Sequence, residues 1–277
     1  MIEFLKAILF GIVEGITEWL PISSTGHMIL LDEFVSLDVT PEFWDVFLVV
    51  IQLGAILAVV ILFWSKIFPF DFSAKGRKKG VIRKDIFQMW FKVIVACIPA
   101  MIYGLLLDDL ISPYLYNATV VALMLILFGA AFIVIENWNR GRKPRVKSIA
   151  ALTYRDALLI GLFQLIAAIF PGTSRSGATI VGALLIGVSR TVSAEFTFFL
   201  AIPVMFGASL LKLVKFGLAF TGAEALLLVT GMVSAFVVSM LVISFLMSYI
   251  RKHDFKVFGW YRIVLGILVL LYFYVIA

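Results

Sequence analysis

The sequence predicts an all-α polytopic membrane protein, and three observations carry this prediction. Hydrophobic residues make up 63% of the 277 residues, and the mean hydropathy is +1.11, whereas a soluble domain is nearer to half apolar. Six runs are long and apolar enough to cross a bilayer, which takes about 20 helical residues. Two further apolar stretches are each interrupted in the middle by proline and small polar residues.

The six runs are expected to form spanning helices, and the two interrupted stretches are expected to form re-entrant hairpins. The expected spans are residues 43–64, 86–107, 118–136, 192–211, 223–247 and 259–276. The interrupted stretches are residues 1–35 and 154–188, where a proline removes a donor and clashes with the preceding turn. Irregular backbone inside a bilayer must be covered by protein or water. We therefore expect two half-length helices in each stretch, which enter and leave the membrane on one side.

Charged residues in the connecting loops predict the orientation of the spans. Basic residues predominate in residues 65–85, in the linker 137–153 and in the turn after Met247, and such an excess is typical of cytoplasmic loops. Residues 108–117 carry two aspartates and no basic residue, so they are expected outside. The first hairpin and both termini then lie on the outer side and the second hairpin on the inner side. Two lysines, Lys212 and Lys215, fall on the outer side against the trend.

The order of elements suggests an inverted repeat. Residues 1–136 and 154–277 each contain one interrupted stretch followed by three spans, and because three is odd the second copy would be upside down. A shift of 150 residues aligns Gly11 with Gly161, Ile16 with Ile166, Pro21 with Pro171 and Ser24 with Ser174. Inverted repeats bring their broken helices together near the bilayer midplane, where one site is built from both halves. We expect one integrated membrane domain.

The first helix break lies within GIVEGITEWLPISSTGH (11–27). Glu14 and Glu18 are four residues apart and would share one helix face, and Ser23, Ser24 and Thr25 are residue types that begin a new helix. Ionisable side chains at this depth mark functional sites. The carboxylate pair could hold a hard divalent cation, Mg²⁺ or Ca²⁺, which favours carboxylate and phosphate oxygens. It could instead act only as counter-charge to an arginine.

His27 lies three residues after Ser24, so both can face one pocket once the new helix has begun. His27 could take a proton from Ser24 or from water, or attack phosphorus itself. The simpler alternative is a histidine that only makes hydrogen bonds at a helix end.

The second helix break is PGTSRSGAT (171–179), in which Arg175 is flanked by hydroxyls and glycines ahead of a new helix. Free N–H groups at a helix start attract anions, and a guanidinium offers a planar fork with permanent charge. The pattern therefore indicates phosphate binding. The alternative is a polar break satisfied internally, with Arg175 paired to a carboxylate. Three other intramembrane polar residues can orient the hairpins and are assigned no chemistry: Asp45, Gln52 and Glu195.

These two motifs, EGITEWLPISSTGH (14–27) and PGTSRSGAT (171–179), closely resemble those of the undecaprenyl pyrophosphate phosphatase family (UppP or BacA), the bacitracin-resistance proteins of bacterial inner membranes. The resemblance extends over the whole chain in length and hydropathy. It implies removal of the terminal phosphate from undecaprenyl pyrophosphate, with a divalent metal and a site that opens to the outer face. It also implies that Glu14 and Glu18 are the paired acidic residues and that Ser24 and His27 are the nucleophile and base candidates. Ser174, Arg175 and Thr179 would bind the pyrophosphate.

We therefore expect a phosphoanhydride hydrolase that recycles the lipid carrier of peptidoglycan synthesis. The expected catalytic residues are Ser24, His27, Glu18 and Arg175; the expected substrate-binding residues are Arg175, Ser174, Thr179, Ser176, Gly172, Ser23 and Thr25; the expected metal ligands are Glu14 and Glu18. Attack by Ser24 with His27 as base is preferred, and attack by His27 or by a metal-bound water is the alternative. The expected partners are the polyprenyl pyrophosphate and membrane lipid, not nucleic acid, and a homodimer is left open. The competing hypothesis is a transporter or flippase of polyprenyl phosphate.

Overall fold

The six expected spans are present as long apolar helices in the computed structural model, which describes residues 1–72, 81–217 and 220–276. They are α3 (Pro41–Leu62), α6 (Lys84–Leu106), α8 (Ala118–Trp138), α11 (Arg190–Phe216), α12 (Gly222–Tyr249) and α13 (Lys256–Leu271), the last continued by a π-helical turn at Tyr272–Ile276. Each is long and apolar enough to cross a membrane. Four residues of the predicted basic loop, Lys75, Arg77, Lys78 and Lys79, lie outside the described residues. The described chain contains helices and two isolated β-bridges, and it is a multi-pass membrane protein.

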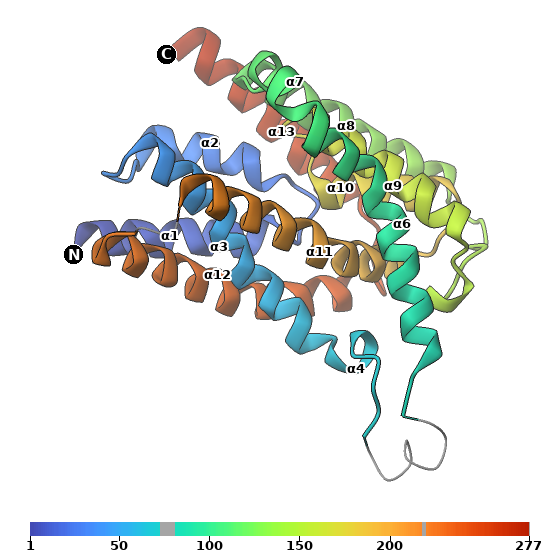
Figure 1. Ribbon diagram of the computed structural model, residues 1–277. Helices are drawn as coiled ribbons and strands as arrows, with labels where there is room; N and C mark the ends of the chain where they lie inside the picture. Colours follow the sequence, from blue (N-terminus) through green and yellow to red (C-terminus); the bar gives the residue numbers. More distant parts are fainter. Residues whose placement is uncertain (73–80, 218–219, 277) are drawn as a thin grey trace.

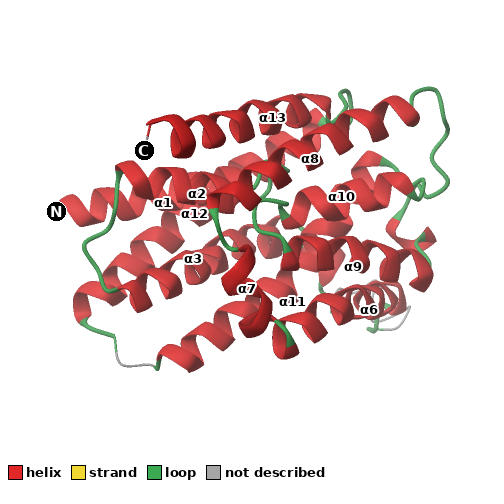
Figure 2. Cartoon of the chain, turned by 90° about the horizontal axis from the view of Figure 1, so that it is seen from above, coloured by secondary structure: helices red, strands yellow, loops and turns green. Residues whose placement is uncertain are grey.

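The two interrupted stretches form pairs of shorter helices. The first pair is α1 (Ile2–Thr17) and α2 (Ser24–Phe34), and the second is α9 (Tyr154–Ile169) and α10 (Arg175–Leu185). An 11-residue helix is about 17 Å long, well short of the roughly 30 Å hydrocarbon core of a bilayer. Figures 1 and 2 show the first pair toward the end of the molecule where both chain ends lie, and the second pair toward the opposite end. Each pair therefore places its break inside the protein.

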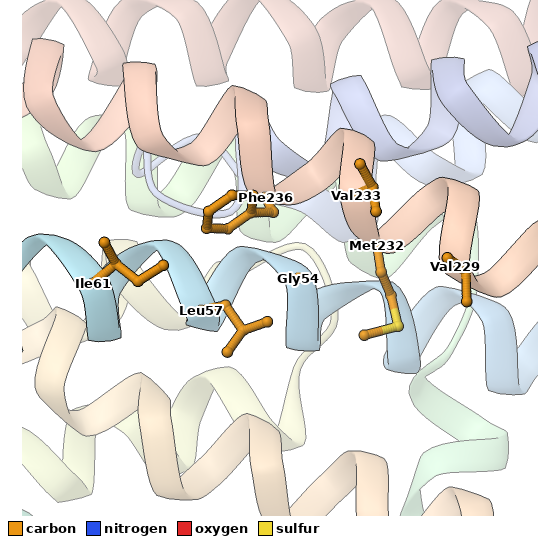
Figure 3. Close-up of a pocket in the computed structure, with 7 residues that line it drawn as sticks. All are labelled: Gly54, Leu57, Ile61, Val229, Met232, Val233 and Phe236. Carbon is orange, nitrogen blue, oxygen red and sulfur yellow. The ribbon is translucent and has the colours of Figure 1, made fainter.

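Each hairpin packs against a span from the other half of the chain. Helix α1 packs along α12, and α9 packs along α6. Helix α12 also packs along α3, where Gly54 allows a very close approach: a Cβ added there would lie 2.0 Å from the carbonyl oxygen of Met232. Figure 3 shows Gly54 and Met232 beside an apolar groove lined by side chains of both helices. This crossed packing is consistent with an inverted repeat, and the repeat itself stays a prediction.

The segment between α6 and α8 differs from the expectation. Residues 108–117 were expected to form a loop, but they contain the helix α7 (Asp108–Leu115). Its first turn holds Asp108 and Asp109, and acidic side chains at a helix start are stabilised by the free N–H groups there. Two shorter elements complete the described chain: α4 (Trp64–Ile67) and a 3₁₀ turn at Ile149–Ala151.

Candidate active site

Both helix breaks use a serine in an unusual backbone conformation. Ser23 has φ 75° and Ser174 has φ 70°, and they are the only non-glycine residues with positive φ in the described chain. Each serine caps its helix, because its side chain accepts the backbone N–H three residues later: Gly26 at 3.3 Å and Gly177 at 3.1 Å. Such a conformation costs roughly 1–3 kcal/mol and is typical of functional sites. The same strained conformation at both serines marks both breaks as candidate parts of a functional site.

The caps correct the register taken from the sequence. The 150-residue shift pairs Ser24 with Ser174, but the structurally equivalent caps are Ser23 and Ser174. The second break contains one more residue between its proline and its cap, so the equivalence moves by one position. As a result Ser24 and Arg175 are the matching residues, and each is the first residue of its helix.

Glu18 connects the two breaks. Its Oε2 accepts the Ser24 hydroxyl at 2.9 Å, and its Oε1 accepts Nη2 of Arg175 at 2.8 Å. Arg175 is 157 residues away in sequence, yet both side chains of this ion pair are largely buried, with 13% of Arg175 and 9% of Glu18 exposed. The backbone carbonyl of Glu18 also accepts the Ser176 hydroxyl at 3.2 Å. In this structure Arg175 therefore has the carboxylate partner that the simpler alternative anticipated.

The rest of the Arg175 guanidinium is held by protein groups. Nη1 donates to the carbonyl oxygen of Thr197 at 3.0 Å, and Nη2 lies 3.7 Å from Sδ of Met205. The guanidinium carbon is 5.9 Å from the ring centroid of Trp19, whose ring packs edge-on against Phe198. These contacts fix the guanidinium in one orientation beside Glu18.

Glu14 is the second acidic residue, and it lacks a full set of partners. Its side chain is 1% exposed, and Oε1 has no hydrogen-bond partner in the described structure. A buried oxygen without a partner is unfavourable, so this atom is available to a cation or a donor group. Glu14 lines a cavity of about 520 Å³ together with Ser24, Thr25 and Pro171. Residues of both breaks therefore meet at one cavity.

The lining of this cavity also contains polar residues to which the sequence assigned no chemistry. Its lining includes Asp32, Asp45, Gln52, Asp108, Tyr116 and Lys212. Lys212 donates to Asp45 at 3.2 Å, and Lys215 pairs with Asp109 at 3.6 Å. These acidic partners account for two lysines at an end where basic residues were not expected. Glu195, the other unassigned acid, pairs with Lys66 instead.

The His27 side chain makes its hydrogen bonds to groups other than the Ser24 hydroxyl. Its Nδ1 lies 2.7 Å from the Ser23 carbonyl oxygen and its Nε2 lies 2.6 Å from the Tyr261 hydroxyl. The two rings are stacked with an interplanar angle of 2°. The Ser24 hydroxyl is bound to Glu18, so in this structure serine and histidine have separate partners. Their pairing during the reaction stays a prediction.

The remaining residues of the second break support the start of α10. Thr179 is fully buried, and its hydroxyl donates to the Arg175 carbonyl at 2.9 Å and meets the Thr197 hydroxyl at 2.8 Å. The hydroxyls of Ser174 and Ser176 are 3.1 Å apart. Gly172 has φ +85°, and a Cβ there would lie 2.5 Å from the carbonyl oxygen of Val121 on α8. Gly172 therefore allows the break to pack closely against α8, and Thr179 ties the first turn of α10 to α11.

Sequence reasoning missed Arg262 of α13, which is wholly buried. Its Nη1 donates to the Pro21 carbonyl at 3.2 Å, and its Nη2 donates to the carbonyls of Gly172 and Thr173 at 2.9 and 2.7 Å. Two carbonyls of α8, those of Met124 and Leu125, are weaker acceptors at 3.4 Å. One guanidinium thus binds backbone carbonyl groups of both breaks. The available signal was an arginine inside an apolar span, which is costly and usually functional.

Comparison with known proteins places the chain in a family. A model of the family described as "Bacitracin resistance protein BacA" matches residues 7–268. The chain is 64% identical over 274 residues to an undecaprenyl-diphosphatase of Desulfitobacterium hafniense, with 99% of this chain and 97% of the relative covered. It is 64% identical over 275 residues to undecaprenyl-diphosphatase 1 of Clostridium acetobutylicum, with 99% of both covered. An undecaprenyl-diphosphatase of Enterococcus faecalis is 63% identical over 270 residues, with 98% of this chain and 97% of the relative covered. The family model and these relatives match nearly the whole chain, which includes both helix breaks and the Glu18–Arg175 ion pair. The chain therefore belongs to the BacA family of bacitracin resistance proteins.

Proposed function

We propose that this chain hydrolyses undecaprenyl pyrophosphate to undecaprenyl phosphate and phosphate in the bacterial inner membrane. The reaction recycles the lipid carrier for cell-wall synthesis, and bacitracin resistance is its consequence. The observation that carries the proposal is the contact of Ser24 and Arg175 with the two oxygens of Glu18, beside a cavity that Glu14 lines. The names of the relatives support the same activity.

The pyrophosphate would bind where α2 and α10 begin. Both helix starts attract anions, and Arg175 supplies a fork that matches phosphate oxygens. Because Arg175 is paired with Glu18 in this structure, the pyrophosphate would share or replace that carboxylate. Binding would then free an oxygen of Glu18 for another role.

The residues present fit a divalent cation, Mg²⁺ or Ca²⁺. Glu14 and Glu18 would hold it, and the unpartnered Oε1 of Glu14 is the observation that favours this assignment. No group of three or more metal-binding side chains lies together among the described residues, so phosphate oxygens and water would complete the ligand set. When bound, the cation would offset the negative charge of the pyrophosphate.

Ser24 is the attacking group that the geometry favours. Its hydroxyl already donates to Oε2 of Glu18, so this carboxylate can receive the proton as Oγ bonds to the terminal phosphorus. The phosphoanhydride bond breaks, undecaprenyl phosphate leaves, and water then releases phosphate from the serine. The alternatives are attack by His27 and direct attack by water.

The decisive experiment measures phosphate release from undecaprenyl pyrophosphate by the purified protein in detergent with Mg²⁺ or Ca²⁺. We expect release that stops with a chelator and resumes when the cation is restored. A folded protein that binds the lipid but releases no phosphate would contradict the proposal and favour the transporter hypothesis.

We propose that the active-site cavity opens to the periplasmic side, because residues of the acidic helix α7 line it and the basic linker lies at the other cavity, at the opposite end of the molecule (Figure 1). In a Cys97→Ala background, a membrane-impermeant maleimide applied to intact cells should label Asp109→Cys and not Arg140→Cys. The reverse pattern would overturn this orientation. A homodimer, which the sequence leaves open, stays untested.

A further inference from the structure

A second cavity of about 510 Å³ lies at the opposite end of the molecule. Its lining residues come from the ends of α8, α10 and α12, from the start of α11 and from the basic linker. Its lining shares no residue with the cavity that Glu14 lines. It therefore needs an explanation of its own.

The charges that line this second cavity are unbalanced. Five are basic and one is acidic: Arg142, Lys143, Arg145, Arg190, Arg251 and Glu136. Arg190 is bound to Glu136, with Nε at 2.8 Å from Oε1, and Arg145 is bound to Asp156 at 2.5 Å. The other three make no ion pair in the part of the chain that the structure describes. Three like charges around one hollow repel each other unless an anion binds between them.

Arg142 is already oriented for such an anion. Its guanidinium carbon lies 4.2 Å from the ring centroid of Trp138, a stacking contact that restrains the plane of the fork. The contact uses the face of the guanidinium and leaves its N–H edge without an acceptor in the described structure. A stacked arginine with a free edge is well suited to bidentate phosphate binding.

The start of α11 adds backbone donors. Ser189, Arg190 and Thr191 line the cavity, and Ser189 caps this 27-residue helix without a side-chain hydrogen bond to it. The first N–H groups of a helix have no partner within it, and they favour phosphate. The turn before the helix is held by the linker, because Ser189 N–H donates to the Val146 carbonyl at 2.9 Å.

The surroundings favour a lipid over a soluble anion. Trp138 is 59% exposed and Leu185 is 54% exposed, and both lie at the cavity beside the unpaired cations. An exposed tryptophan at a helix end is typical of the membrane–water interface. Basic hollows between spanning helices on the cytoplasmic side are suited to anionic headgroups. An excess of basic residues in cytoplasmic loops explains their number, but it does not explain why they surround one hollow.

We propose that this cavity binds the headgroup phosphate of an anionic phospholipid in the cytoplasmic leaflet. Arg142, Lys143 and Arg251 supply the charge, and the N-terminus of α11 supplies backbone N–H donors. The lipid would hold the linker against α10 and α11, and it would do so whether or not substrate occupies the active site. The proposal does not depend on the phosphatase activity.

The test compares two double variants of equal charge. Arg142→Gln with Arg251→Gln removes two cations that line the cavity, and Arg140→Gln with Lys252→Gln removes two exposed cations from the same two loops outside the lining. Detergent-purified proteins are titrated with phosphatidylglycerol, with phosphatidylcholine and with inorganic phosphate. Bound lipid is counted by native mass spectrometry, and thermal unfolding is measured in parallel.

We expect phosphatidylglycerol to bind and stabilise the unmodified protein and the Arg140/Lys252 variant. The Arg142/Arg251 variant should bind it about thirtyfold more weakly, since each cation near an anionic headgroup contributes about a fivefold factor. Equal weakening in both variants would show a diffuse surface charge and overturn the proposal. Equal stabilisation by inorganic phosphate, or by phosphatidylcholine, would overturn the assignment of an anionic lipid.

Discussion

The two helix breaks are built alike and carry different chemistry. Each has a capping serine with positive φ, and each presents the first residue of its new helix to the same carboxylate. In the first break that residue is Ser24, a neutral hydroxyl suited to attack. In the second it is Arg175, a permanent cation suited to bind the pyrophosphate. If Ser24 is the nucleophile, the same backbone conformation used twice, with a different residue after each cap, places the attacking hydroxyl and the anion-binding cation on the two oxygens of one carboxylate.

The breaks also differ in how firmly they are held. Nine consecutive residues of α10, from Ser176 to Leu184, are buried, whereas Gly26 and Met28 are the buried residues of α2. Helix α10 packs on both α9 and α11, while α2 has fewer neighbours. The cation therefore lies on a rigid helix, and the hydroxyl lies on the helix that borders the cavity. This difference predicts that the second break positions substrate and the first break adjusts to it.

The largest effect should come from the second break. We expect Arg175→Ala to lower kcat/KM for phosphate release by about a thousandfold or more, because a preorganised charge aimed at the transition state contributes on this scale. Arg175→Lys keeps the charge but not the planar fork, and it should recover only a small part. Detergent gel filtration checks that both variants fold. Near-normal turnover in a folded Arg175→Ala protein would remove the cation from the mechanism.

Ser24→Ala is the matched change in the first break. If Ser24 attacks phosphorus, nearly all turnover should be lost while the affinity for undecaprenyl pyrophosphate is kept, because the hydroxyl is not a charge that binds the substrate. Rapid quenching with ³²P-labelled substrate should then detect a phosphoenzyme in the unmodified protein and none in Ser24→Ala. Substantial residual turnover would transfer the attack to His27 or to water, and the two breaks would no longer divide the chemistry as proposed.

Arg262 binds the backbone of both breaks, so its replacement tests whether their geometry depends on this one side chain. In Arg262→Lys an ammonium replaces the fork, so it cannot reach the carbonyls of Pro21, Gly172 and Thr173 together. A shift of about 1 Å in a helix start can lower the rate about a hundredfold, so we expect kcat to fall by that order. The thermal unfolding temperature should also fall, because carbonyls buried without donors are destabilising.

The control for Arg262 lies in the turn between α12 and α13. Lys252→Arg in this turn changes an exposed side chain outside both breaks, and it should leave kcat unchanged. An Arg262→Lys protein with normal kcat would show that the breaks hold their shape without the guanidinium, and that each is self-sufficient.

Much of this architecture follows from the sequence, and the exceptions have physical reasons. Continuous apolar runs specify spanning helices because the bilayer requires about 20 apolar residues. The breaks are marked by prolines at 21 and 171 together with the small polar residues that follow them, since prolines at 99 and 203 without such a run lie inside helices. The partner of Arg175 could not be chosen, since Glu14 and Glu18 share one helix face and only packing shows which one the guanidinium reaches. The one-residue offset between Ser23 and Ser174 was hidden because Ser24 gives an equally good match in the alignment.

The residues that sequence reasoning missed act through backbone groups. Arg262 binds backbone carbonyl oxygens. Every residue has one, so its partners cannot be identified from a side-chain motif in the sequence. Tyr261 contacts His27 across 234 positions, and a tyrosine in an apolar span is unremarkable. The helix α7 was missed because its two aspartates suggested a loop, although they lie in the first turn of the helix, where they are favourable.

The smallest expected effect is at Tyr261, which holds His27 away from Ser24. Tyr261→Phe keeps the stacked ring and removes the hydroxyl that lies 2.6 Å from Nε2. One hydrogen bond contributes about 0.5–1.5 kcal/mol, so kcat should change by a factor of about two to ten. A decrease would mean that the Tyr261 hydroxyl keeps His27 in the orientation the reaction uses. An increase would mean that releasing His27 lets it approach Ser24 and act as its base, and the first break would then be the adjustable one. An unchanged kcat and an unchanged pH profile would place His27 outside the chemistry and leave Glu18 as the proton acceptor for Ser24.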